Sequence, residues 1–196
     1  MSDEPSWSEF YDRVADRPPH ETVVGALDRF EREGRRTGFA VDLGCGDGRD
    51  AAELARRGWR VLAIDAEEEA IERLRARPGL EAVETLVARF EEATWPRADL
   101  VNAGFSLAFC APEHFGEVWR RIVESLRPAG RFSGQLFGDR DGWAGDAEMT
   151  FVTRSEAESL FAGFELERFD EVDEDGHLVT GAPKHWHVFH VVAKRA

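Results

Sequence analysis

VDLGCGDGRD, residues 41–50, is the segment from which the fold of this chain is most directly predicted. It begins within a short apolar run, residues 39–44, and leads into a segment with helical spacing, residues 50–57. Its three glycines allow a tight turn and a close approach of the backbone to a ligand. A glycine-rich turn between a strand and a helix is typical of α/β folds that bind nucleotides at the strand ends.

The same alternation of strand and helix patterns continues outward from this segment along the whole chain. The predicted helices cover residues 20–33, 50–57, 67–77, 113–126 and 155–161, and the predicted strands cover residues 39–44, 60–65, 81–88, 99–105, 131–138, 164–174 and 185–193. A short polar connection, residues 175–184, predicts that the last two strands form an antiparallel hairpin. We therefore predict an α/β fold, a Rossmann-like doubly wound seven-stranded sheet that is mostly parallel with an antiparallel last strand.

Composition and charge restrict the partners that the chain can have. With 196 residues, 42% of them hydrophobic, the chain can form one domain with a substantial core. Its formal net charge is −14, from 25 Lys and Arg against 39 Asp and Glu. A surface this acidic repels phosphate backbones and anionic lipids, so we expect no nucleic acid and no membrane as partner. The N-terminus MSDEPSWSEF lacks the apolar stretch of a secretory signal, and we expect a cytoplasmic protein.

Two acidic residues indicate which cofactor the glycine turn accepts. Asp65 ends the second predicted strand, where a carboxylate can accept both hydroxyls of a ribose. Asp42 precedes the glycines and would repel a pyrophosphate, whereas it suits a ligand with an ammonium group, such as S-adenosylmethionine. The dinucleotide pattern GxGxxG is absent because the third glycine, Gly48, comes one position early. These features favour S-adenosylmethionine over a nicotinamide dinucleotide.

The sequence here resembles the class I S-adenosylmethionine-dependent methyltransferases. VDLGCGDG at 41–48 is similar to their first motif, Asp65 to their ribose-binding acid, and LRPAGRF at 126–132 to the turn into their fifth strand. The resemblance runs from about residue 20 to residue 194, and the size and tail look closest to the tellurite-resistance and thiopurine-type enzymes. It implies a single methyltransferase domain over residues 20–196, an N-terminal lid segment over residues 1–19, and methyl transfer to a small-molecule acceptor by in-line displacement.

The resemblance also implies a set of cofactor-binding residues. Asp42 would lie near the amino group of the cofactor and Asp65 at its ribose. Where many relatives carry an acid that bonds adenine, this chain has Arg89, so the face of Phe90, or Glu91 or Glu92, would take that role. The remaining residues that the resemblance places at the cofactor are Gly44, Cys45, Gly46, Ala66, Asn102, Ala103 and Gly104. We expect Cys45 to fill space in the loop rather than act as a nucleophile, because no base is near it in the sequence.

The acceptor should bind at the carboxyl edge of the sheet, where ligands of open parallel sheets bind. The residues predicted to contact it come from the ends of strands, the loop 138–151, the start of the last strand and the N-terminal segment: Phe105, Arg140, Trp143, His185, Tyr11 and Arg17. Arg140 either holds an anionic acceptor or pairs with Asp139 or Asp141.

No catalytic residue can be assigned from the sequence. A soft nucleophile needs no base, whereas an amine, phenol or carboxylic acid can need one. The candidates for a base are His185, His187, His114 and Tyr11. His185 and His187 alternate onto one face of a strand and resemble a metal-binding pair, but the sequence offers no third ligand, and we expect no metal.

Two other functions are compatible with the same segments. A catalytically silent S-adenosylmethionine-binding protein or partner subunit is suggested by Arg89 and by the lack of a decisive catalytic residue. A nicotinamide-dependent oxidoreductase is disfavoured by the missing GxGxxG pattern. For the oligomeric state we expect a monomer or a homodimer.

Overall fold

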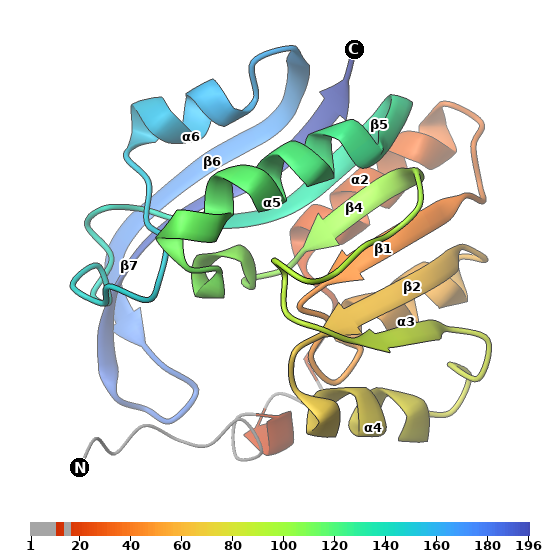
Figure 1. Cartoon of the computed structure of the whole chain (residues 1–196), viewed down its shortest axis with the longest axis horizontal. Coiled ribbons are helices and arrows are strands. Elements are labelled where there is room, and N and C mark those ends of the chain that lie inside the picture. Colours follow the sequence, from red (N-terminus) through yellow and green to blue (C-terminus); the bar gives the residue numbers. More distant parts are fainter. Residues whose placement is uncertain (1–10, 14–16) are drawn as a thin grey trace.

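The computed structural model describes residues 11–13, which are helical, and residues 17–196. Within these ranges the helices and strands alternate as predicted (Figure 1). In chain order they are α2 (Glu21–Arg32), β1 (Phe39–Leu43), α3 (Arg49–Arg56), β2 (Arg60–Asp65), α4 (Glu68–Ala76), β3 (Glu84–Val87), β4 (Ala98–Ala103), the 3₁₀ helix η1 (Leu107–Phe109), α5 (Pro112–Ser125), β5 (Leu126–Phe137), α6 (Arg154–Leu160), β6 (Phe164–His177) and β7 (Pro183–Arg195).

The strands form one seven-stranded sheet in the order β3-β2-β1-β4-β5-β7-β6. β1 pairs in parallel with β2 and β4, and the pairs β2–β3 and β4–β5 are also parallel. β7 runs antiparallel to both of its neighbours, β5 and β6. The predicted Rossmann-like sheet with an antiparallel last strand is therefore confirmed, including the hairpin between β6 and β7.

The boundaries of β5 differ most from the prediction. The sequence segment 126–130 contains Pro128 and Gly130 and was expected to be a turn, but β5 begins at Leu126, which pairs with Ala98. The segment is still irregular, because the register with β4 shifts between Ala98 and Leu100 and Ala129 has a φ of 59°. The backbone thus keeps sheet pairing on both sides of a local distortion, which residue patterns alone do not predict.

Helices cover both faces of the sheet, with α5 and α6 in front and α2 and α3 behind in the view of Figure 1. One core cluster lies between the sheet and α5, with Trp119 and Ile122 packed on strand residues such as Phe132. A second cluster lies between the sheet and α2, α3 and α4, with Phe30 and Leu54 among its buried side chains. Apolar faces on both sides explain why the central strands are nearly continuous apolar runs.

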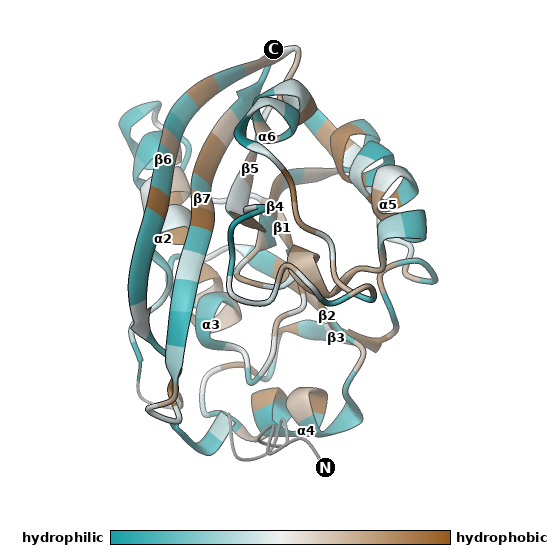
Figure 2. Cartoon of the chain, turned by 90° about the vertical axis from the view of Figure 1, so that its left-hand side faces the viewer, coloured by the Kyte–Doolittle hydropathy of each residue, from teal (hydrophilic) through white to brown (hydrophobic). Residues whose placement is uncertain are grey.

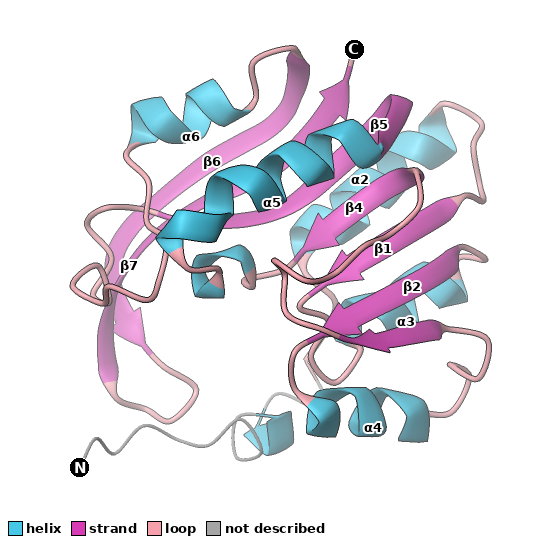
Figure 3. Cartoon of the chain, viewed as in Figure 1, coloured by secondary structure: helices cyan, strands magenta, loops and turns pink. Residues whose placement is uncertain are grey.

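The fold brings distant segments together at one edge of the sheet. The loops that follow β1, β2 and β4 gather there (Figure 3), at the carboxyl ends of parallel strands. Because β7 is antiparallel, its beginning lies at the same edge, where the amide of Gly138 donates to the carbonyl of His187 at 2.6 Å. β6 and β7 extend beyond the edge as a hairpin whose outer half is mainly hydrophilic (Figure 2). In the described part of the chain, no helix is both long and apolar enough to cross a membrane.

Candidate cofactor and acceptor site

The glycine loop joins β1 to α3 and forms the floor of the candidate site. Gly44, Gly46 and Gly48 have φ values of 67°, 53° and 87°, a region that other residues rarely adopt. The amides of Gly44 and Cys45 both donate to the carbonyl of Ile64, at 2.8 and 3.0 Å, so the loop is fixed to the end of β2. A side chain at Gly44 would also collide with Ser106, since a Cβ there would lie 2.3 Å from the Ser106 Cβ. The sequence therefore needs glycine here for both backbone and packing reasons.

Asp65 lies beside this loop at the end of β2. Its Oδ2 accepts a hydrogen bond from the amide of Gly46 at 2.8 Å, and its Oδ1 accepts one from the amide of Glu67 at 2.9 Å. Burial raises the pKa of Asp65 above its usual range. The side chain of Asp65 is thus held next to the glycine turn. It remains partly exposed, so it is accessible to the hydroxyl groups of a ribose.

A buried polar network lies under the loop at the ends of β1 and β4. The Asn102 amide donates to Asp42 Oδ1 at 2.8 Å and to Asp50 Oδ2 at 2.9 Å, and the Ser133 hydroxyl donates to Asn102 Oδ1 at 2.7 Å. Asp42 Oδ2 is the one buried side-chain oxygen or nitrogen without a partner in the described residues. Burial, reinforced by the charge of Asp50, raises the pKa of Asp42 to about 8. A buried carboxyl oxygen without a partner is costly, and a cationic group of a ligand would favour the ionised form of Asp42, so this site is suited to such a group.

The other predicted cofactor residues fall into two groups. Phe90 lies against the loop, with its ring 3.4 Å from the position that a Cβ on Gly44 would take. Ala66, Asn102, Ala103 and Gly104 also belong to the strand-end edge that borders the loop. Arg89, in contrast, is exposed and pairs with Glu91 at 3.0 Å.

Cys45 lies in the loop but is buried, and its thiol contacts the carbonyl of Gly46 at 3.6 Å. Burial raises the pKa of the Cys45 thiol well above its usual value. The protonated thiol is a poor nucleophile, which agrees with the expectation that Cys45 fills space in the loop.

Phe105, directly after β4, is the centre of an aromatic cluster at the same edge. Its φ of 53° is unusual for a residue with a side chain and costs roughly 1–2 kcal/mol. Its amide donates to Gln135 Oε1 at 3.0 Å, which holds this conformation. The Phe105 ring lies 6.0 Å from the Phe137 ring and 6.3 Å from the Trp186 ring, edge to face. The strained turn thus places a half-buried ring where an acceptor would enter.

Lys184 extends this cluster toward the loop 138–151. Its ammonium group lies 4.0 Å from the ring centroid of Trp143 and 4.4 Å from that of Trp186, and it pairs with Asp141. The Lys184 side chain is only 2% exposed. Burial lowers the pKa of Lys184. The buried ion pair fastens the loop that carries Trp143 to the first residues of β7, so the predicted acceptor residues Phe105 and Trp143 belong to one cluster.

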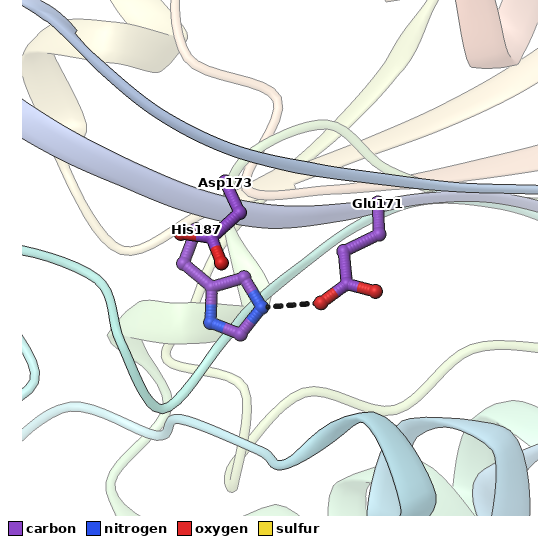
Figure 4. Close-up of side chains that lie close together, drawn as sticks. All are labelled: Glu171, Asp173 and His187. Carbon is purple, nitrogen blue, oxygen red and sulfur yellow. Dashed lines mark hydrogen bonds and ion pairs between the residues drawn. The ribbon is translucent and has the colours of Figure 1, made fainter.

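His187 is held by neighbouring side chains and is not free to act as a base (Figure 4). The amide of Arg140 donates to His187 Nδ1 at 3.0 Å, and Nε2 lies 2.9 Å from Glu171 Oε1 and 3.0 Å from a guanidinium nitrogen of Arg140. His187 is fully buried, and both of its ring nitrogens already have partners. The structure therefore disfavours His187 as a base.

His185 and Arg140 are likewise held by acidic residues. His185 contacts Asp173 at 2.8 Å and Asp175 at 2.7 Å, and these carboxylates raise its pKa. Arg140 pairs with Asp173 at 2.6 Å and Glu171 at 2.9 Å, whereas Asp139 lies 3.7 Å away. Of the two predicted roles of Arg140, ion pairing is the one observed. Its main partners lie on β6, however, and were not among those expected.

The same cluster contains a set of possible metal ligands that differs from the pair His185 and His187 considered from the sequence. One ligand atom each of Glu171, Asp173 and His187 lie within 4.8 Å of one another. A terminal guanidinium nitrogen of Arg140 is already 2.9 Å from Glu171, 2.6 Å from Asp173 and 3.0 Å from His187 Nε2. The positive charge of Arg140 thus occupies the position that a cation would need.

Three other predicted residues have surroundings that differ from the aromatic cluster. Tyr11 is buried over the glycine loop, 3.2 Å from the position of a Cβ on Gly46, and burial raises its pKa, which makes it a poor base. Arg17 is exposed, and His114 is exposed in the first turn of α5. Residues 1–10 and 14–16 of the predicted lid lie outside the described residues.

Two histidines that the sequence analysis did not select lie at this edge. His20 precedes α2, and its Nδ1 is 2.8 Å from Asp50 Oδ2. His190, on β7, has its ring 5.8 Å from the Phe105 ring, and burial lowers its pKa. No motif marks either residue, because each reaches the site through packing of distant segments.

The comparisons with known proteins agree with this geometry. Residues 40–130 match the family described as "Methyltransferase domain". No curated protein matches the sequence. Among solved structures, TehB from Haemophilus influenzae is similar with a TM-score of 0.80 at 18% identity, covering 95% of this chain and 66% of that chain. This chain therefore spans about two thirds of the TehB chain.

Two further similar structures are methyltransferases solved with a bound cofactor or product. One is the 1,6-didemethyltoxoflavin-N1-methyltransferase of Burkholderia thailandensis with 1,6-didemethyltoxoflavin and S-adenosylhomocysteine (TM-score 0.68, 24% identity, 97% of this chain and 84% of that one). The other is magnesium protoporphyrin IX methyltransferase of Synechocystis PCC 6803 with S-adenosylmethionine (TM-score 0.68, 13% identity, both chains fully covered). At these identities the likeness establishes the fold. The matched domain adds that residues 40–130 of this chain are similar to a methyltransferase domain.

Proposed function

We propose that the strand-end crevice binds S-adenosylmethionine and that the chain transfers its methyl group to a small-molecule acceptor. The observation that carries this proposal is Asp42 Oδ2, a buried carboxyl oxygen without a hydrogen-bond partner. The α-ammonium group of S-adenosylmethionine would favour the ionised form of Asp42 and is a partner of the required charge. A pyrophosphate would instead place an anion next to Asp42 and the ionised Asp50, which disfavours the nicotinamide reading.

The remaining contacts follow from the arrangement around Asp42. Asp65 would accept the ribose hydroxyls while keeping its bond to the Gly46 amide. The backbone of residues 44–46 would run along the methionine and ribose, and Phe90 would border the adenine together with Ala66. Asn102, Ala103 and Gly104 would lie near the sulfonium end. Arg89 points to Glu91 and receives no role.

When bound, the cofactor supplies a methyl carbon that its sulfonium already activates. The chain then has to align the acceptor for in-line attack and keep water out. Phe105, Trp143 and Trp186 form an aromatic wall suited to both tasks. The Burkholderia and Synechocystis relatives act on small molecules by their names, which supports an acceptor of that kind. A cytoplasmic location, a monomeric or homodimeric state, and the division into a lid and one domain stay predictions.

Titration calorimetry with S-adenosylmethionine, S-adenosylhomocysteine and NAD tests the cofactor assignment. Wild type should bind the first two, and Asp65→Ala should bind them at least about tenfold more weakly, because hydrogen bonds to a charged group contribute about 1.5–3 kcal/mol. Glu67→Gln, an exposed neighbour, is the matched control. Binding of NAD alone would contradict the proposal.

A methyl-transfer screen over thiols, phenols, amines and oxyanions then tests catalysis. Transfer to any of these acceptors would establish the enzyme activity of the crevice. Tight binding of S-adenosylmethionine without transfer to any of them would instead favour the catalytically silent binding protein.

A further inference from the structure

A histidine–aspartate pair lies beside the end of β4, against Gly104 and Phe105, and has no role in the cofactor contacts proposed above. His20 Nδ1 is 2.8 Å from Asp50 Oδ2, and the backbone amide of His20 donates to Asp50 Oδ1 at 2.9 Å. The two side chains are 17% and 6% exposed. Burial alone would raise the pKa of Asp50, but the hydrogen bonds from His20 outweigh it and keep the pKa below its usual value. Asp50 is therefore an anion that orients the imidazole.

The contact with Asp50 indicates which ring nitrogen of His20 carries the proton. Because the ionised Asp50 can only accept, Nδ1 of His20 carries the ring proton. Nε2 is then left with a lone pair. The guanidinium group of Arg49 lies against the same edge of the ring and contacts both Nδ1 and Nε2. An acceptor molecule with an ionisable O–H or N–H group would present the same kind of donor.

Gly104 and Phe105 fix the position of the pair relative to the reacting groups. A Cβ on Gly104 would lie 2.6 Å from His20 Nδ1 and 2.7 Å from Asp50 Oδ2, so the pair packs directly on the end of β4. On its other side, the His20 ring is 5.2 Å from the Phe105 ring. The imidazole thus lies between the proposed sulfonium end of the cofactor and the aromatic wall.

The surroundings of Phe105 indicate the shape of the acceptor. Its ring is half-buried and is flanked by His20, Phe137, Trp186 and His190. Flat π faces favour stacking or edge contacts with another flat ring. An aliphatic or inorganic acceptor would gain little from such a wall.

We propose that the acceptor is a flat aromatic compound with a weakly acidic hydroxyl or N–H group, and that Nε2 of His20 takes the proton of that group. This inference rests on the proposed function, because it needs the methyl donor in the crevice. A bond forms between the acceptor oxygen or nitrogen and the methyl carbon, while the sulfur–carbon bond breaks and its electron pair stays on sulfur. The acceptor proton moves to Nε2 and then to solvent. Arg49 has to turn away from Nε2, and the carboxylate of a bound cofactor offers it an anion.

The test uses the full chain, S-adenosylmethionine and two acceptors of the same shape, 2-naphthol and 2-naphthalenethiol. At mildly alkaline pH the thiol is already ionised, whereas the hydroxyl is not. Wild type should methylate both. His20→Gln should lower kcat for the naphthol about 100-fold or more, the range of general base catalysis, and leave kcat for the thiol within about threefold. His177→Gln, an exposed histidine of the hairpin, should leave both rates unchanged.

Several results would overturn the proposal. Equal losses with both acceptors would show a structural role of His20, and weaker binding of S-adenosylhomocysteine by His20→Gln would show a cofactor role. A selective loss in His190→Gln but not in His20→Gln would move the role to the other imidazole. Failure of wild type to methylate 2-naphthol while it binds S-adenosylhomocysteine refutes this inference alone, whereas failure to bind S-adenosylhomocysteine refutes the proposed function itself.

Discussion

Replacing Asp42 by Asn removes the ionisable group of this residue and keeps nearly the same side-chain shape. Asp42 is buried, accepts one hydrogen bond from Asn102 and leaves Oδ2 without a donor. A hydrogen bond from a cationic ligand to this carboxylate should contribute about 1.5–3 kcal/mol. Since each 1.4 kcal/mol is a factor of ten, Asp42→Asn should bind S-adenosylhomocysteine about 10- to 150-fold more weakly than wild type.

The pH dependence of binding gives the same prediction a second readout. The pKa of Asp42 is raised to about 8 by burial and by Asp50, so the free protein holds this carboxyl protonated at neutral pH. Binding of an ammonium group requires the carboxylate and must release that proton. The affinity of wild type should therefore rise about tenfold from about pH 6 to about pH 7, then level off and fall as the ligand's own amino group, with a pKa of about 8, loses its proton. Asp42→Asn should lack the rise.

Titration calorimetry measures both effects, and 5′-methylthioadenosine is the ligand control. This compound lacks the amino-acid part, so its affinity should be the same in wild type and variant and should not rise with pH. The stability of the free protein gives a further check. Because the pKa of Asp42 is higher folded than unfolded, wild type should lose stability as pH rises from about 4 to about 8, and the variant should lose less. Unchanged affinity of Asp42→Asn for S-adenosylhomocysteine would refute the assignment of Asp42 to the ammonium group.

Three further predictions concern the framework of the site. Arg131 is fully buried and pairs with Glu33 at 2.6 Å and with Glu167 at 2.8 Å. Arg131→Met should lower the free energy of unfolding by about 3–5 kcal/mol, since both carboxylates lose their buried cation and keep only Lys194 and Arg29 as partners. Equal urea midpoints of Arg131→Met and wild type would contradict this. Arg131 and Lys194 also hold the pKa of Glu33 at about 2, so wild type should lose stability as pH falls from about 4.5 to about 2. A series of thermal melts in which Arg131→Met loses as much stability as wild type over this range would contradict the role of Arg131. Lys184→Met should leave Asp141 buried without its cation, loosen the loop 138–151 and change the fluorescence of Trp143 and Trp186. Lys184→Arg keeps the charge and is the control. Identical protease sensitivity of this loop in Lys184→Met and wild type would contradict the role of the ion pair.

For the catalytic candidates, the sequence predicted the position of the side chains but not their partners. His185 and His187 were selected because they start the last strand, and both do lie at the carboxyl edge. Their chemistry was decided by Glu171, Asp173 and Asp175 on the neighbouring strand β6, whose acids pair across the hairpin. Pairing register between two strands fixes such contacts, and an alternating pattern alone does not give the register.

His20 was overlooked for a related reason. In the sequence it is only the residue before a helix, and its partner Asp50 is 30 positions away. The turn chemistry of Gly44, Gly46 and Gly48 was visible, in contrast, because positive φ values are a local property of glycine. The sequence therefore indicated the cofactor side of the crevice more completely than the acceptor side.

By itself, the sequence determined the order of strands and helices, the antiparallel end of the sheet, the glycine loop and the two acids Asp42 and Asp65. These follow from periodicity, turn preferences and the charge of single residues, all of which act over a few neighbouring positions. Only the tertiary structure decided that Asp42 keeps a buried oxygen without a donor, that Arg140 closes the acidic cluster, and that His20 meets Asp50 beside Phe105. These properties depend on burial and on contacts between segments far apart in the chain, which exist only once both faces of the sheet are packed.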